Sequence, residues 1–89
     1  MRFQSFEWDD INVGHIARHG VEPYEVETAC WGSQAFVLRG REGRYVAYGR
    51  TGSGRYLFIV FRILGQGIIH VITARDMSAT ERRFYQGRN

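Results

Sequence analysis

The run from Tyr56 to Phe61 constrains the fold of this chain more than any other stretch. It reads Tyr-Leu-Phe-Ile-Val-Phe, six apolar residues in succession, most of them aromatic or β-branched. Such residues favour strands, and a run without polar alternation indicates a strand that is covered on both faces. We therefore expect residues 56–61 to form the central, most buried strand of a sheet, with Arg62 closing it.

Glycine-containing turns separate this run from further candidate strands. Thr51-Gly-Ser-Gly54 is a tight connection between two strand-like segments, which predicts a hairpin. Aromatic residues near the N-terminus indicate a short edge strand that docks on the core. The remaining candidate strands are 35–38, 44–50 and 68–74, and the N-terminal aromatic residues are Phe3, Phe6 and Trp8.

Two helices are predicted in the first third of the chain. Asp9 or Asp10 can cap a first helix, which runs to about residue 19 and ends before Gly20. Pro23 fits the first turn of a second helix, which extends to about Trp31. The side chains expected on the inner faces are Ile11 and Ile16 in the first helix, with His15 as a further candidate, and Val26, Ala29 and Cys30 in the second.

A capping box marks the start of a third helix near the C-terminus. Ser78 can accept a hydrogen bond from the backbone N–H of Glu81, whose side chain can reach back to the N–H of Ser78. The helix is expected to span residues 79–86 and to end at Gly87. The order of elements is then β-α-α-β-β-β-β-α, which predicts a single α+β domain over residues 1–89, an antiparallel sheet with two N-terminal helices and one C-terminal helix.

Arg75 and Asp76 stand between the last predicted strand and this third helix, at a rim of the sheet. A helix N-terminus presents free N–H groups and a partial positive charge, both of which suit a phosphate. Glu81, Arg82 and Tyr85 follow at spacings that make helix side chains neighbours. On residue types alone, the same arrangement also fits a capped helix with a solvated polar face.

All 12 basic residues are arginine, and the charge is unevenly distributed along the chain. Residues 1–30 hold two arginines and six acidic residues, whereas residues 31–89 hold ten arginines and three acidic residues. Arginine binds phosphate through two parallel hydrogen bonds. The basic part of the chain therefore indicates a polyanion or an acidic protein as partner.

The sequence offers no signature of a disulfide framework, a metal site or a membrane segment. Cys30 is the only cysteine, His15 and His19 lack ligand partners at useful spacing, and no carboxylate cluster suggests Mg²⁺. We expect no metal and no cofactor. The N-terminus lacks the apolar core of a signal peptide, and no apolar run is long enough to cross a bilayer. We expect a soluble, cytoplasmic protein that does not associate with membranes.

Several motifs, in a fixed order along the chain, resemble one known family. They are Phe6-Glu-Trp-Asp9, Arg18-His-Gly-Val21, Gly43-Arg-Tyr45, Gly49-Arg-Thr51, Val71-Ile-Thr-Ala-Arg75 and Glu81-Arg-Arg-Phe-Tyr85. Together they resemble the BrnT family, whose members are toxins of bacterial type II toxin–antitoxin systems. The resemblance covers nearly the whole chain.

The resemblance implies a fold, an activity and a partner. The fold would be similar to that of RelE-type ribonucleases, and the activity would be cleavage of RNA that inhibits translation. The partner would be a ribbon-helix-helix antitoxin of the BrnA type, and DNA would be bound only through the complex. The resemblance also implies that Arg75, Glu81, Arg82 and the position of His70 belong to the active region.

Cleavage of RNA without a metal requires a base for the 2′-hydroxyl, positive charge for the phosphorane and an acid for the leaving 5′-oxygen. Arg75 and Arg82 are the candidates for stabilising the phosphate. Glu81 is a candidate general base, or it orients Arg75 through a salt bridge. His70 suits acid or base work because histidine ordinarily titrates near neutral pH, although a lone histidine on a strand is commonly structural.

Other residues are candidates for RNA binding alone. Arg62 and Arg55 are expected to contact the RNA backbone, and Tyr85 is a candidate for stacking on a base, with core packing as the alternative. Two further functions stay open at this point: a catalytically degenerate toxin that acts only as co-repressor with its antitoxin, and a free-standing RNA-binding protein. An antitoxin-like neighbouring gene would argue against the free-standing protein, and growth arrest on expression would argue against the degenerate toxin.

Overall fold

The computed structural model describes residue 3 and residues 5–88. Their elements follow the predicted order of one strand, two helices, four strands and one helix, which confirms the α+β class. They are β1 (Ser5–Glu7), α1 (Asp10–Ala17), α2 (Pro23–Trp31), β2 (Phe36–Arg39), β3 (Arg44–Arg50), β4 (Tyr56–Ile63), a 3₁₀ turn (Gly65–Gly67), β5 (Ile68–Asp76) and α3 (Ala79–Gln86).

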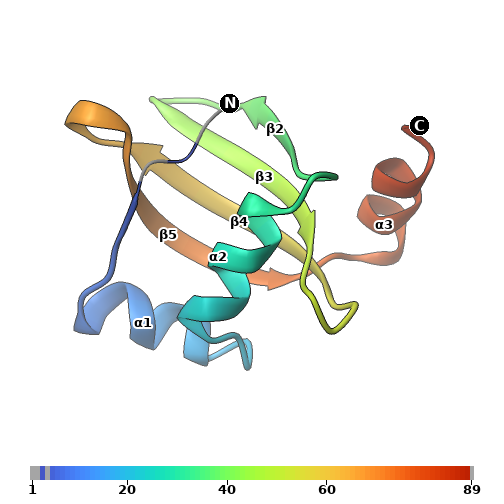
Figure 1. Ribbon diagram of the computed structural model, residues 1–89, viewed down its shortest axis with the longest axis horizontal. Helices are drawn as coiled ribbons and strands as arrows, with labels where there is room; N and C mark the ends of the chain where they lie inside the picture. Colours follow the sequence, from blue (N-terminus) through green and yellow to red (C-terminus); the bar gives the residue numbers. More distant parts are fainter. Residues whose placement is uncertain (1–2, 4, 89) are drawn as a thin grey trace.

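The strands form one five-stranded sheet in the order β1-β5-β4-β3-β2 (Figure 1). Strands β2 to β5 pair antiparallel, as predicted, but β1 pairs parallel with β5, so that Ser5 lies opposite Ile68. The expectation of an antiparallel sheet was wrong at this edge. Two helices and three strands separate β1 from β5 in sequence, so no hairpin fixes their relative direction. The sheet is therefore mixed.

Strand β4 lies at the centre of the sheet, as its apolar run predicted. Leu57, Ile59 and Phe61 are fully buried on the face that α1 and α2 cover (Figure 1). On the other face of the strand, the alternate residues Tyr56, Phe58 and Val60 are only half-buried. The strand continues one residue beyond Arg62, to Ile63. The central position is confirmed, whereas the second face is covered only in part.

Helix α1 begins with a reciprocal cap. The side chain of Asp9 accepts from the backbone N–H of Asn12, and the Asn12 side chain accepts from the backbone N–H of Asp9. Asn12 also donates to the backbone oxygen of Glu7 at 2.9 Å and is buried. Ile16 faces the core as predicted, but the inward placement of Ile11 and His15 was wrong, since both are exposed. Asn12, whose side-chain amide completes the cap, faces inward instead.

Helix α2 packs closely on β3, and one glycine makes this approach possible. Val26, Ala29 and Cys30 are buried, which confirms the predicted inner face. A Cβ atom added to Gly49 would lie 2.5 Å from the backbone oxygen of Ala29, closer than real contacts allow. Pro23 occupies the first turn of the helix, as predicted.

Strand β5 is longer than predicted and contains a bulge. Its pairing with β4 shifts by one residue, so that Ile72 is extra between Val71 and Thr73. The bulge lets Val71 and Ala74, three positions apart, both point into the core. Arg75 and Asp76 are the last two residues of the strand rather than part of the connection to α3, because both still pair with β4.

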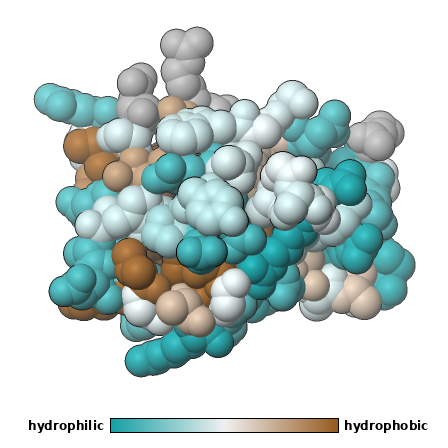
Figure 2. Space-filling model, turned by 60° about the horizontal axis from the view of Figure 1, so that its bottom comes forward, coloured by the Kyte–Doolittle hydropathy of each residue, from teal (hydrophilic) through white to brown (hydrophobic). Residues whose placement is uncertain are grey.

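Helix α3 lies beside the end of the sheet at which β5 ends (Figure 1), and its Phe84 reaches the sheet face that α1 and α2 leave open. Its Phe84 ring contacts Phe36 and Tyr48, with centroids 5.6 and 5.4 Å apart. Figure 2 shows mainly hydrophilic side chains over the half of the molecule that carries α3, and more hydrophobic ones over the other half. Among the described residues, no helix is long and apolar enough to cross a membrane.

Candidate active face of the sheet

The open face of the sheet carries two groups of polar side chains, one at each end. The first group is aligned by strand register: Arg44 of β3 pairs with Arg62 of β4, which pairs with His70 of β5. Beyond His70, the edge strand β1 places Glu7 in register with it. Four neighbouring strands thus set four polar side chains in one row across the sheet.

Glu7 and His70 make the close side-chain hydrogen bond of this row. The Nδ1 atom of His70 lies 2.9 Å from Oε1 of Glu7, and the two side chains are 31% and 50% exposed. When Nδ1 carries the proton and its N–H donates a hydrogen bond to the carboxylate, Nε2 is left free to accept a proton. A carboxylate that fixes the imidazole in this way prepares it for acid–base chemistry.

A hollow of about 440 Å³ lies over this row. Its lining residues are Glu7, Arg44, Arg62, Leu64, His70 and Ile72. Within residues 5–88, neither Arg44 nor Arg62 has a carboxylate within salt-bridge distance. The hollow therefore combines a positioned histidine with two arginines whose charge is available to an anion.

Three side chains at this edge could also hold a cation. Glu7, Asp9 and His70 each offer one ligand atom, and these atoms lie within 4.8 Å of one another. One oxygen of Asp9 already accepts from the backbone N–H groups of Ile11 and Asn12 at the start of α1. Sequence reasoning missed this group because it judged spacing along the chain, whereas β1 and β5 meet only in the folded sheet.

The second group contains Arg75, at the end of β5, and Glu81, in the first turn of α3. The Arg75 guanidinium donates to both oxygens of Glu81 at 2.8 and 3.0 Å and lies 4.3 Å from the ring centre of Phe58. This guanidinium, together with hydrogen bonds from Ser78, lowers the pKa of Glu81 to about 2. A carboxylate with such a pKa is a weak base at neutral pH. The contacts favour the second of the two expected roles, in which Glu81 orients Arg75.

Arg82 and Tyr85 lie on α3 near this second group. The Arg82 guanidinium is 4.0 Å from the ring centre of Tyr56. The Tyr85 hydroxyl donates to the backbone oxygen of Gln34 at 3.1 Å, and its ring meets that of Tyr56 edge-on. Both side chains are thus held by contacts within the protein while they border the open face.

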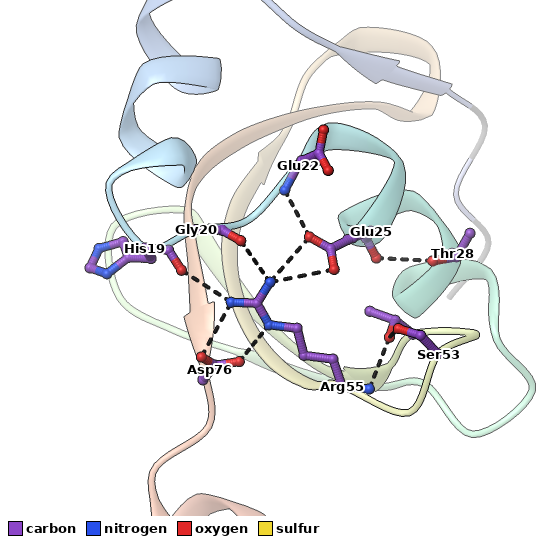
Figure 3. A network of polar contacts seen from close by, with 9 residues as sticks. His19, Gly20, Glu22, Glu25, Thr28, Ser53, Arg55 and Asp76 are labelled. Atoms are coloured by element: carbon purple, nitrogen blue, oxygen red, sulfur yellow. Dashed lines mark hydrogen bonds and ion pairs between the residues drawn. The ribbon is translucent and has the colours of Figure 1, made fainter.

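Arg55 lies apart from both groups and is bonded into the fold (Figure 3). It donates to both oxygens of Asp76, at 2.7 and 3.2 Å, and to Glu25 at 3.2 Å. It also donates to the backbone oxygens of His19 and Gly20. These contacts use every N–H that a guanidinium has. Arg55 therefore joins the start of β4 to the end of β5 and to the connection between α1 and α2.

Comparison with known proteins identifies a family whose model matches this chain and a crystal structure with a similar fold. The family model of the ribonuclease toxin BrnT of type II toxin–antitoxin systems matches residues 8–81. This chain belongs to the BrnT family. The crystal structure of the Brucella abortus ribonuclease toxin BrnT is similar to it, with a TM-score of 0.67 and 23% sequence identity, over 83% of this chain and 96% of that one. At this identity the similarity establishes the fold. A search among curated proteins finds no match.

Membership of the BrnT family implies an antitoxin partner. The residues expected in the active region do not meet at one point: His70 and Arg75 pair with Arg62 and Phe58, which are four positions apart on β4, roughly 13 Å at the usual rise of a strand. Arg62 lies beside His70, and Arg82 and Tyr85 lie at the Arg75 end. Glu7 and Arg44 complete the His70 end and were not foreseen.

Proposed function

We propose that this BrnT-family chain is a metal-independent endoribonuclease whose reaction takes place in the hollow around His70. The observation that carries the proposal is the His70–Glu7 contact of 2.9 Å beside Arg62 and Arg44, on the exposed face of the sheet. A positioned imidazole and two guanidinium groups that have no carboxylate partner among residues 5–88 can supply the base and the positive charge that cleavage of RNA by its own 2′-hydroxyl requires.

In the proposed reaction, Nε2 of His70 accepts the proton of the 2′-hydroxyl. The 2′-oxygen then bonds to phosphorus while the bond from phosphorus to the 5′-oxygen breaks, which yields a 2′,3′-cyclic phosphate and a free 5′-hydroxyl. A water molecule or the protonated histidine returns a proton to the leaving 5′-oxygen. Arg62 and Arg44 hold the phosphate, and their hydrogen bonds strengthen as negative charge develops on it. Glu7 is a positioning residue that keeps the imidazole in one tautomer.

The remaining candidate residues have supporting roles in this proposal. Arg75 provides positive charge farther along the RNA, since two of its N–H groups are not used by Glu81 or Asp76. Glu81 orients Arg75 and does not act as the base. Arg82 and Tyr85 contact RNA at the α3 end of the face. Arg55 is not part of the proposed RNA surface, because its donors are engaged within the fold.

We further propose that the fold is RelE-like, that cleavage inhibits translation, and that the antitoxin is a ribbon-helix-helix protein. Its acidic segment would cover the exposed arginines of the open face, and the antitoxin would supply the DNA-binding element. Purified toxin should therefore show no specific footprint on its operator, whereas the complex should protect it. A sequence-specific footprint by this chain alone would contradict the assignment of DNA binding to the antitoxin.

The enzymatic proposal is tested with the purified chain, free of antitoxin, on a labelled single-stranded RNA in excess EDTA. We expect products with 2′,3′-cyclic phosphate and 5′-hydroxyl ends. A substrate with 2′-deoxyribose at the cut position should not be cleaved, since it lacks the attacking oxygen. Cleavage that requires Mn²⁺ or Zn²⁺ would instead make Glu7, Asp9 and His70 a metal site and overturn the metal-independent reaction. Absence of any cleavage would leave the degenerate co-repressor as the better account.

A further inference from the structure

A second hollow lies at the other end of the molecule, beside α3. It has a volume of about 570 Å³, and its lining residues are Gln34, Arg50, Tyr56, Tyr85, Gln86 and Arg88. The side chains of Arg50 and Tyr56 lie on the open face, because Arg50 pairs with Tyr56 two positions beyond the pair of Tyr48 and Phe58 that α3 covers. This second hollow is therefore on the same side of the sheet as the hollow around His70.

Arginine and tyrosine side chains stack on one another at this second hollow. The guanidinium carbons of Arg50 and Arg82 lie 5.1 and 4.0 Å from the ring centre of Tyr56, and Tyr85 meets the same ring edge-on. Arg88 lies over the ring of Phe36. Guanidinium planes and aromatic rings held in this way are surfaces on which unpaired nucleobases stack.

The positive charge of this end is not neutralised within the described part of the chain. Arg55 and Arg75 have carboxylate partners, whereas Arg50, Arg82 and Arg88 have none among residues 5–88. A hydrogen bond from Gln86 and the charges of Arg50 and Arg82 lower the pKa of the Tyr56 hydroxyl, as expected in a positive environment. The α3 end thus offers an anion several guanidinium groups at once.

We propose that this arginine–tyrosine hollow is a second RNA subsite, which binds an unpaired nucleotide of the strand that is cut at His70. The proposal rests on the function proposed above and deepens it by naming the substrate as single-stranded. Six positions of β4 separate Tyr56 from Arg62, about 20 Å at the rise of a strand, so the RNA must continue several nucleotides beyond the cut phosphate. Stacking requires bases that are free of a duplex.

The subsite is tested by comparing a long substrate with a minimal one. The variant is Arg50→Ala, and the control is Arg18→Ala, which removes the same charge from the exposed end of α1. We expect Arg50→Ala to lower kcat/KM on a twelve-nucleotide RNA roughly tenfold and to leave cleavage of a dinucleotide unchanged, because only the longer RNA reaches the α3 end. Arg18→Ala should cleave both substrates as the unmodified chain does.

Binding of a twelve-nucleotide strand with 2′-deoxyribose at the cut position gives a readout that does not depend on catalysis. In fluorescence anisotropy, Arg50→Ala should weaken binding about tenfold and reduce the slope of log affinity against log salt by about 0.7, one phosphate contact. Arg50→Lys should restore the slope but only part of the affinity, since an ammonium group does not stack.

The possible results distinguish a failure of the proposed subsite from a failure of the ribonuclease proposal on which it rests. Unchanged binding and cleavage in Arg50→Ala would overturn the subsite, as would an equal loss on long and minimal substrates. Weaker binding of the antitoxin with unchanged RNA binding would assign the hollow to the antitoxin and also overturn it. If no RNA is cleaved but binding of the longer strand still depends on Arg50, the ribonuclease proposal fails while the subsite stands.

Discussion

Glu81 accepts two hydrogen bonds from the Arg75 guanidinium, at 2.8 and 3.0 Å, and a third from the backbone N–H of Ser78 at 2.8 Å. These bonds join the end of β5 to the first turn of α3 and hold the helix against the sheet. They also stabilise the ionised carboxylate, which is why the pKa of Glu81 falls from its ordinary 4.5 to about 2. The contact therefore contributes to stability and positions Arg75.

The first prediction concerns the pH dependence that this contact creates. Because the pKa of Glu81 is lower in the folded chain than in the unfolded chain, the contribution is complete above about pH 4.5 and is lost as pH falls toward 2. We expect its size to be about 1–2 kcal/mol, since Arg75 is 38% exposed and solvent screens the pair. Thermal unfolding between pH 6 and 2 should therefore show a smaller loss of stability in Glu81→Gln than in the unmodified chain.

The control for this prediction is Glu42→Gln, which removes a carboxylate from the exposed turn between β2 and β3. It should keep the pH dependence of the unmodified chain. Identical curves for Glu81→Gln and the unmodified chain would show that the contact with Arg75 adds nothing to folding.

The second prediction concerns the central strand. Ile59 is fully buried, so Ile59→Ala should lower the free energy of unfolding by about 2–4 kcal/mol. Ile11→Ala removes the same atoms from a side chain that is 72% exposed and should change stability by less than about 0.5 kcal/mol. Urea titration of the two variants measures the difference, and equal effects would contradict the placement of these two side chains.

The third prediction concerns Arg55, which sequence reasoning had assigned to RNA. Arg55→Ala leaves Glu25 and Asp76 without their common partner and should lower the free energy of unfolding by about 2–3 kcal/mol. Affinity for single-stranded RNA, measured on protein that remains folded, should stay the same. Unchanged stability together with weaker RNA binding would return Arg55 to the RNA surface.

Much of the fold could be predicted because local signals and the global arrangement agree. The apolar run at 56–61 predicted the central strand, and Ser78 with Glu81 predicted the start of α3. The burial of Asn12 in place of Ile11 was missed because hydrophobicity favoured Ile11. The hydrogen bonds that Asn12 makes at the start of α1 decide which side chain faces inward.

The candidate site was harder to predict than the fold, for a physical reason. Its residues come from four strands, and Glu7 meets His70 only because β1 pairs parallel with β5. Nothing local specifies that pairing, since two helices and three strands intervene. Arg62 and His70 could each be singled out by residue type, but their alignment with Arg44 depends on the register across β3, β4 and β5.

His70 is the central residue of the proposed active site, and one comparison of variants tests its role directly. His70→Ala and His19→Ala each remove one imidazole, and His19 lies at the exposed end of α1, away from both hollows. Cleavage of a labelled single-stranded RNA is measured in EDTA, with circular dichroism to verify folding and His70→Gln as a second variant that retains a polar side chain. We expect both His70 variants to lose about 10²–10⁴-fold in cleavage rate and His19→Ala to cleave normally. Cleavage by folded His70→Ala at the rate of the unmodified chain would contradict the proposed active site.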